Sequence, residues 1–253
     1  MSTTTTDKTS FIDRLFKAGS HFGFKKSRRH PTVAPFLYTT KDGNDIFDLE
    51  KTTALLDSAK EALKTAGQLG KTVLFVGTKD EVSVIVKQAA EKTSSPFVTN
   101  RWIGGMLTNY SEIKKRINRL EALVNERESG ELERKYVKKE RVVIGREVDK
   151  LSFNFSGIAA MQKLPDMMLV VDPRHDAIAV SEALGKNIPV VAIMGSDCDA
   201  SQIKFPVVAN DALQSSVALI LTELAEAYAA GKTEFVPKVV EPRRAPVVRR
   251  RPA

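Results

Sequence analysis

The stretch Arg101-Trp102-Ile103-Gly104-Gly105-Met106-Leu107-Thr108-Asn109 separates two kinds of sequence pattern in this chain. Strands alternate with helices before it, and one long charged helical pattern follows it. Gly104 and Gly105 lack a Cβ atom, so the backbone can turn sharply there or approach another surface closely. Asn109, with Glu112 three residues later, predicts a capping box at a helix start. We therefore expect the chain to leave a compact layer, turn at the glycine pair and enter a helix.

Short apolar runs alternate with amphipathic patterns on both sides of this stretch. The predicted strands are 72–76, 97–98, 167–171, 188–193 and 205–209, and the predicted helices are 48–69, 81–91, 177–184 and 212–228. A repeated strand and helix predict a parallel sheet with right-handed crossovers. We expect an α/β fold with a doubly wound, mainly parallel sheet of the flavodoxin-like or Rossmann-like kind, about five strands wide. A β-hairpin around Asp42-Gly43 should precede it.

A charged segment, 110–151, interrupts this pattern. Its first half has apolar residues at steps of four, three and four, namely Ile113, Ile117, Leu120 and Val124. Its second half, after Ser129-Gly130, repeats an apolar row in Val137, Ile144, Val148 and Leu151. Such narrow rows predict an inserted antiparallel coiled-coil hairpin, although Gly145 weakens the second helix by about 1 kcal/mol relative to alanine.

The expected organisation has four parts. A disordered N-terminus covers 1–10, the α/β body comprises 11–109 and 152–231, the hairpin is 110–151, and a disordered basic tail rich in Pro and Arg covers 232–253. The net charge of +8 is distributed unevenly among segments: +6 in 1–41, −1 in 42–109, +3 in 110–151, −5 in 152–231 and +5 in 232–253. This distribution suits a folded body that basic extensions hold on a polyanion. Ordinary solvated surface charge is the alternative.

Composition also limits the classes of protein to consider. Cys198 is the single cysteine, which excludes an intrachain disulfide and a multi-cysteine zinc site and favours a reducing compartment. No apolar run reaches the roughly 18–20 residues that a membrane span needs. Residues 1–9 lack the features of a secretion signal or a transit peptide. A cytoplasmic protein is the simplest expectation.

The loops that follow the predicted strands do not form a complete catalytic motif. They are 77–80, 172–176 and 195–199, and neither a phosphate-loop ending nor a Gly-x-Gly-x-x-Gly motif is present. Asp172, His175 and Asp176 fit a helix-capping aspartate beside an exposed histidine better than an acid/base or metal site. Cys198 has no neighbouring base to activate it, so we interpret it as a small turn residue. We predict no catalytic residue, metal site, cofactor or small-molecule substrate.

The nonapeptide 101–109 resembles a signature of the bacterial small-subunit ribosomal protein two family. Four more segments are similar to that family in the same order: 17–23, 47–52, 74–79 and 164–166 with the strand that follows. Together they span Phe11 to Tyr228. The family's first segment often reads His-Phe-Gly-His, whereas this chain has Phe24 in the last position. That departure argues against a paired-histidine metal role and leaves His21 as a core or RNA-facing residue.

The resemblance implies a structural constituent of the small ribosomal subunit that binds ribosomal RNA and supports translation in the cytoplasm. It also implies contacts with the head and body of the subunit and docking of neighbouring ribosomal proteins, including ribosomal protein one, without a membrane. The expected RNA contacts act through charge and shape and are Lys25, Lys26, Arg28, Arg29, Arg101, Lys114, Lys115, Arg116, Arg249, Arg250 and Arg251. The last three belong to the tail, which is often acidic in the family.

Several alternatives remain at this stage. Trp102 either stacks on an RNA base or anchors the turn in the core while Arg101 faces outward. A sugar-phosphate or nucleotide-binding enzyme on the same fold would bind its ligand at 77–80 or 195–199. A coiled-coil adaptor that binds only protein would not need the basic clusters.

Overall fold

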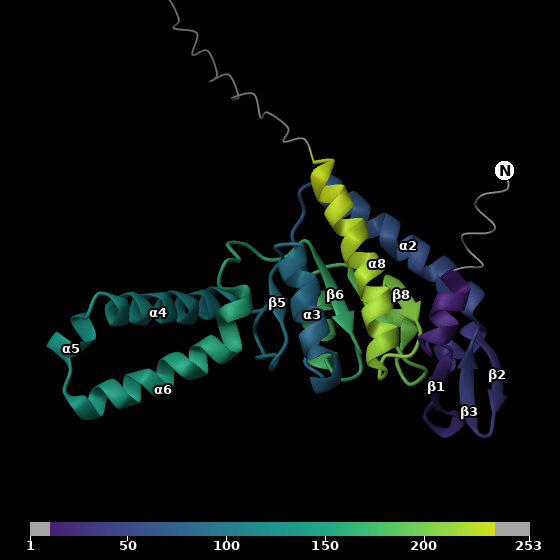
Figure 1. Ribbon diagram of the computed structural model, residues 1–253, viewed down its shortest axis with the longest axis horizontal. Coiled ribbons are helices and arrows are strands. Elements are labelled where there is room, and N and C mark those ends of the chain that lie inside the picture. The colour runs from purple at the N-terminus through teal and green to yellow at the C-terminus, as the bar shows by residue number, and fades with distance from the viewer. Residues whose placement is uncertain (1–10, 236–253) are drawn as a thin grey trace, which may run out of the picture.

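The computed structural model describes residues 11–235 of the chain (Figure 1). The predictions for 1–10 and for Arg249, Arg250 and Arg251 lie outside the described residues. The chain begins there with a helix at 11–17. No helix in the described part is both long enough and apolar enough to cross a lipid bilayer.

A five-stranded parallel sheet forms the centre of the molecule. In spatial order it contains β5 (Phe97–Val98), β4 (Val73–Val76), β6 (Met167–Val171), β7 (Val190–Met194) and β8 (Phe205–Val208). Nearly every residue of β4, β6 and β7 is buried, as expected for parallel strands covered on both faces. The predicted mainly parallel α/β fold is confirmed. The carboxyl ends of β4, β6, β7 and β8 point to one edge, because all four strands run parallel.

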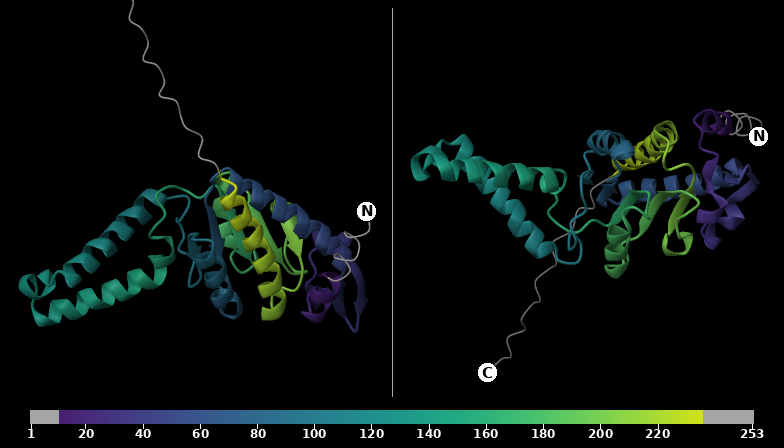
Figure 2. Two further views of the ribbon diagram at one scale, coloured as in Figure 1. Left: turned by 45° about the horizontal axis from the view of Figure 1, so that its top comes forward. Right: turned by 90° about the horizontal axis from the view of Figure 1, so that it is seen from below.

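Helices cover both faces of this sheet, and alternate strand residues divide the core into two layers. Val73, Phe75 and Leu169 pack with α2 (Leu49–Gln68), α3 (Asp80–Lys92) and α8 (Gln214–Thr233). Their sequence neighbours Leu74, Val76 and Met168 pack with α7 (Ala177–Gly185) and the 101–109 loop. In Figure 2 α3 and α8 lie side by side over one face. The alternation follows from the two-residue repeat of a strand.

A small antiparallel sheet lies beside the main one, in the order β1 (Phe22–Lys25), β3 (Asn44–Phe47), β2 (Leu37–Lys41). Asp42 and Gly43 both have positive φ, 52° and 79°, as the predicted two-residue hairpin turn requires. β1 itself was not predicted, because its four residues include a glycine and run directly into a basic cluster, which was interpreted as a loop. The short 3-10 turns η1 (Lys26–Arg28) and η2 (Pro31–Phe36) connect it to β2.

The charged segment forms α4 (Tyr110–Glu128), α5 (Glu131–Lys135) and α6 (Lys138–Phe155), which project from the body as a hairpin (Figure 1). α4 packs against α6, and a separate apolar cluster fills the space between the helices: Leu120, Leu123, Leu132, Ile144 and Val148. Gly130 has φ of 72° and lies between α4 and α5. After the hairpin the chain returns to the body, where the short 3-10 turns η3 (Ser156–Ile158) and η4 (Ala200–Gln202) lie.

The predicted capping box at Asn109 is wrong. No backbone N–H bonds to the Asn109 side chain, although the residue occupies the N-cap position of α4. Its Oδ1 instead accepts a hydrogen bond from the Ser111 hydroxyl, at 3.4 Å. The backbone angles of Asn109, φ −123° and ψ 47°, differ from the extended conformation of a typical N-cap residue.

Candidate nucleic-acid interface

The basic loop, residues 25–30 at and after the end of β1, is held by the buried carboxylate of Asp45. Arg29 Nε lies 2.8 Å from Asp45 Oδ2, and Arg29 Nη2 bonds to Asp45 Oδ1 and, at 2.7 Å, to Thr40 Oγ1. The Asp45 side chain is fully buried and that of Arg29 is 22% exposed. The hydrogen bonds from Arg29 hold the pKa of the Asp45 carboxyl below its usual value. Arg29 therefore directs its guanidinium into the protein.

Contacts to the end of β7 fix the same loop on the main sheet. Phe24 N donates to Ser196 Oγ at 3.0 Å, and His30 N donates to the Ser196 carbonyl at 2.8 Å. Arg28 lies over the Phe24 ring, 4.6 Å from its centroid, and donates to Asp197 Oδ2 at 3.0 Å. The Arg28 side chain is still 54% exposed. These contacts therefore hold the loop against the carboxyl end of the main sheet.

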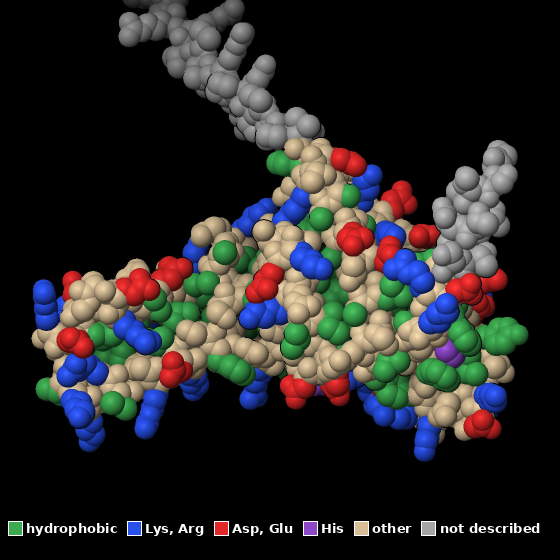
Figure 3. All heavy atoms as spheres, in the orientation of Figure 1, with side chains coloured by type: hydrophobic (Ala, Val, Ile, Leu, Met, Phe, Trp, Pro, Cys, Tyr) green, Lys and Arg blue, Asp and Glu red, His purple; other side chains and the backbone are tan. Residues whose placement is uncertain are grey.

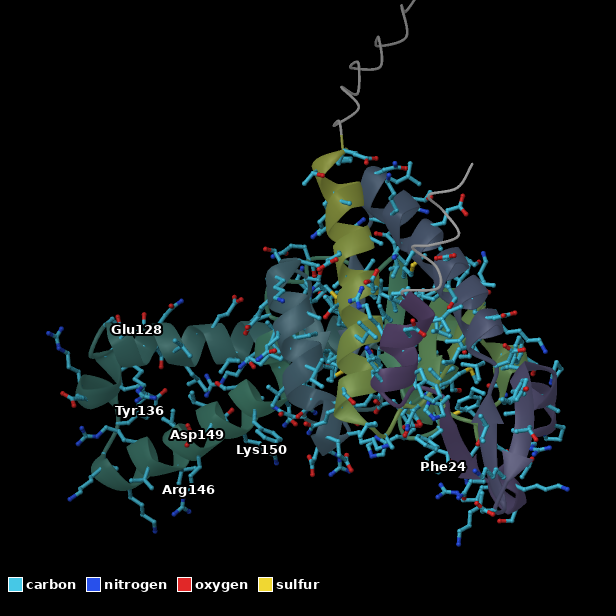
Figure 4. All side chains as sticks on the ribbon, turned by 45° about the vertical axis from the view of Figure 1, so that its right-hand side comes forward. Phe24, Glu128, Tyr136, Arg146, Asp149 and Lys150 are labelled. Atoms are coloured by element: carbon cyan, nitrogen blue, oxygen red, sulfur yellow. The ribbon has the colours of Figure 1, made fainter. Side chains whose placement is uncertain are left out.

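Lys25 and Lys26 are the exposed cations of this loop. Lys25 has no ion pair or side-chain hydrogen bond within residues 11–235. Lys26 helps to lower the pKa of the Asp45 carboxyl by charge alone, without a direct contact. Figure 4 labels Phe24, the residue directly before Lys25. Both ammonium groups are therefore available to an anionic partner.

The 101–109 loop is organised around one carboxylate of α7. Glu182 Oε1 accepts from Trp102 Nε1 at 3.1 Å and from Gly105 N at 2.7 Å. Its Oε2 accepts from Leu107 N and from the backbone and hydroxyl of Thr108, all at 3.0 Å. Burial raises the pKa of the Glu182 carboxyl, but these donors outweigh burial and the pKa lies below its usual value.

This arrangement decides between the two roles considered for Trp102. Its side chain is 8% exposed and lies in the core, whereas Arg101 is exposed. The anchoring role is therefore confirmed, and Arg101 is left without an ion pair in the described structure. Sequence reasoning missed Glu182, whose only signal was a carboxylate among the apolar residues of a helix.

On the hairpin, the three residues of the predicted basic cluster differ in their partners within the protein. Lys115 is paired with Glu112 at 2.6 Å, and Lys114 Nζ lies 3.5 Å from the carbonyl of Gln162. Arg116 is exposed, with no partner among the described side chains. On α6, four exposed cations likewise lack ion pairs in this part of the chain: Lys138, Lys139, Arg146 and Lys150. Arg146 and Lys150, labelled in Figure 4, were not predicted, although their four-residue spacing puts them on one helix face.

Figure 3 shows how these charges are distributed over one face of the molecule. Lys and Arg side chains gather along the lower edge of the hairpin, at the left, and around the three-stranded sheet, at the right. Asp and Glu side chains lie between them along the lower edge. On this face, the two basic surfaces are separated by the acidic side chains.

The loops at the carboxyl edge of the main sheet differ from the basic surfaces, because their polar side chains bond to one another. A helix-capping aspartate was expected here, but Asp176, at the N-cap position of α7, makes no side-chain cap bond. Its carboxylate accepts instead from Thr78 N at 3.2 Å and from Thr78 Oγ1 at 2.7 Å. His175 is half exposed and lies 3.0 Å from the same hydroxyl. Cys198 is buried, and burial together with the nearby carboxylates raises the pKa of its thiol above the ordinary value.

His21 occupies an aromatic stack at the edge of the body. Its ring lies 4.3 Å from the Phe16 centroid and 4.0 Å from that of Phe22. The ring is partly buried, which lowers the pKa of the imidazole. Phe16 and Phe22 are more than half exposed, so His21 belongs to a surface stack rather than to the deep core.

Comparisons with known proteins agree with this architecture. The chain matches the family described as Ribosomal protein S2 over residues 15–231. It is 40% identical over 221 residues to the small ribosomal subunit protein uS2 of Petrotoga mobilis, covering 87% of this chain and 76% of that protein. The uS2c protein of Rhodomonas salina is 39% identical over 220 residues, covering 87% and 90%. The exposed basic loop and the projecting hairpin thus belong to a member of the ribosomal protein S2 family.

Proposed function

We propose that this chain is a structural constituent of the small ribosomal subunit, where it binds ribosomal RNA and supports translation. Family membership supports this general role. The observation that carries the RNA contacts is the set of exposed cations that lack ion pairs in the described structure, on the basic loop and on the hairpin. Phosphates release condensed counterions when such cations bind them.

The predicted contact residues take different parts in this proposal. Lys25, Lys26, Arg101 and Arg116 contact phosphates directly, because their side chains are exposed and have no ion pair among the described residues. Arg28 can share its half-exposed guanidinium between Asp197 and RNA. Arg29 positions the loop through Asp45. Lys114 and Lys115 contribute less to RNA affinity, since each already has a partner on the protein.

The shape of the molecule supports contacts with more than one part of the subunit. The hairpin projects on the side of the body opposite the three-stranded sheet (Figure 1). The two basic surfaces therefore lie far enough apart to reach different RNA segments, as a bridge between head and body requires. We propose that neighbouring proteins, ribosomal protein one among them, dock on the body, and that Arg249, Arg250 and Arg251 add RNA contacts from the tail.

The salt dependence of subunit binding tests this function. Lys25→Gln with Lys26→Gln should make the slope of log affinity against log salt less negative by about 1.4–1.8, because two phosphate contacts are lost. The measurement is binding of the purified full chain to small subunits stripped of this protein, between about 50 and 200 mM salt. Lys87→Gln is the matched control, since Lys87 is exposed but lies 3.9 Å from Glu91 on α3.

Two results would contradict the proposal. One is an unchanged salt slope in the double variant, which would remove the basic loop from the interface. The other is wild-type protein that stays at the top of a sucrose gradient, apart from small subunits, at both salt concentrations. The family match leaves the enzyme alternative without support. A rise in melting temperature with a sugar phosphate or nucleotide would revive that alternative.

A further inference from the structure

Three potential ligand groups meet beyond the carboxyl ends of three strands. Asp172 directly follows β6, Cys198 lies in the loop after β7, and Asp211 follows β8. One carboxylate oxygen of each aspartate and the sulfur of Cys198 lie within 4.8 Å of one another, and all three residues are buried. The parallel sheet creates this proximity, because neighbouring strands deliver their carboxyl ends to the same edge.

The carboxylate of Asp211 is only partly satisfied within the described residues. The residue is 1% exposed, and its Oδ2 atom has no hydrogen-bond donor. A buried carboxylate oxygen without a hydrogen-bond donor is costly, because it has lost its hydration without gaining a partner on the protein. The other oxygen, Oδ1, would lie 2.6 Å from a Cβ atom placed on Gly195, so a side chain at position 195 would displace the carboxylate.

The charges around the cluster are only partly balanced. Lys79 Nζ lies 3.3 Å from Asp172 Oδ2. Nearby Asp197 already binds Arg28 and Arg174, at 3.0 and 2.7 Å. One lysine therefore faces two buried carboxyls. Burial and the adjacent Asp172 raise the pKa of Asp211 to about 7, against the opposing effect of Lys79.

We propose that Asp172, Cys198 and Asp211 form a binding site for a divalent transition-metal ion, with Zn²⁺ as the best match. One thiolate and two carboxylates are ligands that Zn²⁺ accepts, and three protein ligands leave a fourth position for water. Metal–ligand distances of about 2.0–2.3 Å require the three side chains to close slightly around the ion. On binding, the Cys198 thiol loses its proton to solvent and the sulfur forms the metal bond.

Such an ion would join the ends of β6, β7 and β8. The loop after β7 also contacts the basic loop through Ser196 and Asp197. The ion would therefore stabilise the segment against which Lys25 and Lys26 are positioned. The site itself does not depend on RNA binding. Its test uses the isolated full chain and is separate from the test of subunit binding.

Cobalt titration tests this site directly. Purified full-length protein is first treated with a chelator and then titrated with Co²⁺, which replaces Zn²⁺ in tetrahedral sites and reports bound thiolate by an intense near-ultraviolet charge-transfer band. We expect one equivalent of Co²⁺ to produce that band and one equivalent of Zn²⁺ to abolish it. Zn²⁺ should also raise the melting temperature, because the unfolded chain does not present the three ligands together.

Four variants separate ligation from folding. Cys198→Ser should remove the charge-transfer band, and Asp211→Asn should lower the affinity at least tenfold, as loss of a supporting group already costs 10- to 100-fold. Lys79→Met should raise the affinity about tenfold or more, because it removes a cation that competes for Asp172. Asp199→Asn is the matched control, since Asp199 lies beside Cys198 but bonds to Ser201 and Gln202. Circular dichroism checks that each variant is folded.

Two outcomes would overturn the proposal. The first is folded wild-type and Lys79→Met protein that both fail to bind one equivalent of Co²⁺ or Zn²⁺. The second is stoichiometric binding that Cys198→Ser and Asp211→Asn leave unchanged, which would place the ion elsewhere. In either case Lys79 and a proton on Asp211 would balance the buried charge.

Discussion

Glu182 illustrates how one buried residue can set the shape of a loop distant in sequence. Its carboxylate accepts five hydrogen bonds from the 101–109 loop. Trp102 donates one from its side chain, and the other four come from the backbone of Gly105, Leu107 and Thr108 and from the Thr108 hydroxyl. Glu182→Gln would replace one acceptor oxygen with an NH₂ group that faces N–H donors. We expect it to lower the free energy of unfolding by about 2–4 kcal/mol. Urea denaturation measures this, with the exposed Glu226→Gln as control.

The effect of Glu182→Gln on the free energy of unfolding should depend on pH. The folded-state pKa of Glu182 is depressed, so its ionised form stabilises the protein above the unfolded-state value, near 4.3. That contribution disappears as the pH falls through the folded-state pKa. The stability difference between wild type and Glu182→Gln should therefore be full at pH 7 and shrink below about pH 4.3. A difference independent of pH would show that the variant acts by packing rather than by loss of charge.

At the residue scale, the sequence predicted what depends on local pattern. For Trp102 the local pattern left base stacking and anchoring of the turn open, and the structure shows the anchoring role with Arg101 exposed. The partners of polar residues did not follow, because Trp102 and Glu182 are 80 positions apart. Arg29 shows the same limit. Its place in a basic cluster predicted a phosphate contact, whereas the fold brings buried Asp45 to its guanidinium.

Two helical glycines should respond to alanine in opposite directions. A Cβ atom at Gly231 of α8 would lie 2.2 Å from the Lys64 carbonyl oxygen of α2, so the two helices would have to separate. Gly231→Ala should cost about 1–3 kcal/mol. A Cβ atom at Gly145 of α6 meets no atom within 4 Å. Gly145→Ala should therefore stabilise the protein by up to about 1 kcal/mol through helix propensity.

Thermal or urea unfolding of the two glycine variants measures both changes. Equal effects of the same sign would mean that helix propensity, rather than the α2–α8 contact, decides the outcome. Gly67 of α2 lies at the same crossing, where a Cβ atom would be 2.6 Å from the Tyr228 carbonyl oxygen. Gly67→Ala should thus resemble Gly231→Ala.

At the element scale, periodicity predicted the parallel strands and the long helices, because apolar repeats reflect burial directly. It missed β1 and the short α5, which contain four and five residues. β1 exists because β3 lies beside it, with Phe22 opposite Ile46. α5 exists because Gly130 reverses the chain and Leu132 enters the hairpin cluster. For β1 and α5, unlike the equally short β4 and β8, the contacts with neighbouring elements are decisive.

The whole molecule combines a deeply packed body with a projecting hairpin that has its own apolar cluster. Ile113, Ile117 and Phe155, at the base of the hairpin, belong to the core of the body. The distal cluster of Leu120, Leu123, Leu132, Ile144 and Val148 is separate from that core. This division supports our proposal that the hairpin and the α/β body are distinct parts of the fold, joined at a shared apolar base.

That division can be tested by replacing 119–148 with a short Gly/Ser linker. The change removes the complete distal cluster but retains Ile113, Ile117 and Phe155 at the base. We expect the body to unfold cooperatively, with a free energy within about 1 kcal/mol of the full chain, because distant and independent regions contribute additively. The basic loop and Arg116 remain, whereas Lys138, Lys139 and Arg146 are lost. Binding to stripped small subunits should therefore weaken and lose part of its salt dependence. Loss of cooperative unfolding would instead show that the body needs the distal hairpin. Unchanged subunit binding would remove Lys138, Lys139 and Arg146 from the RNA interface.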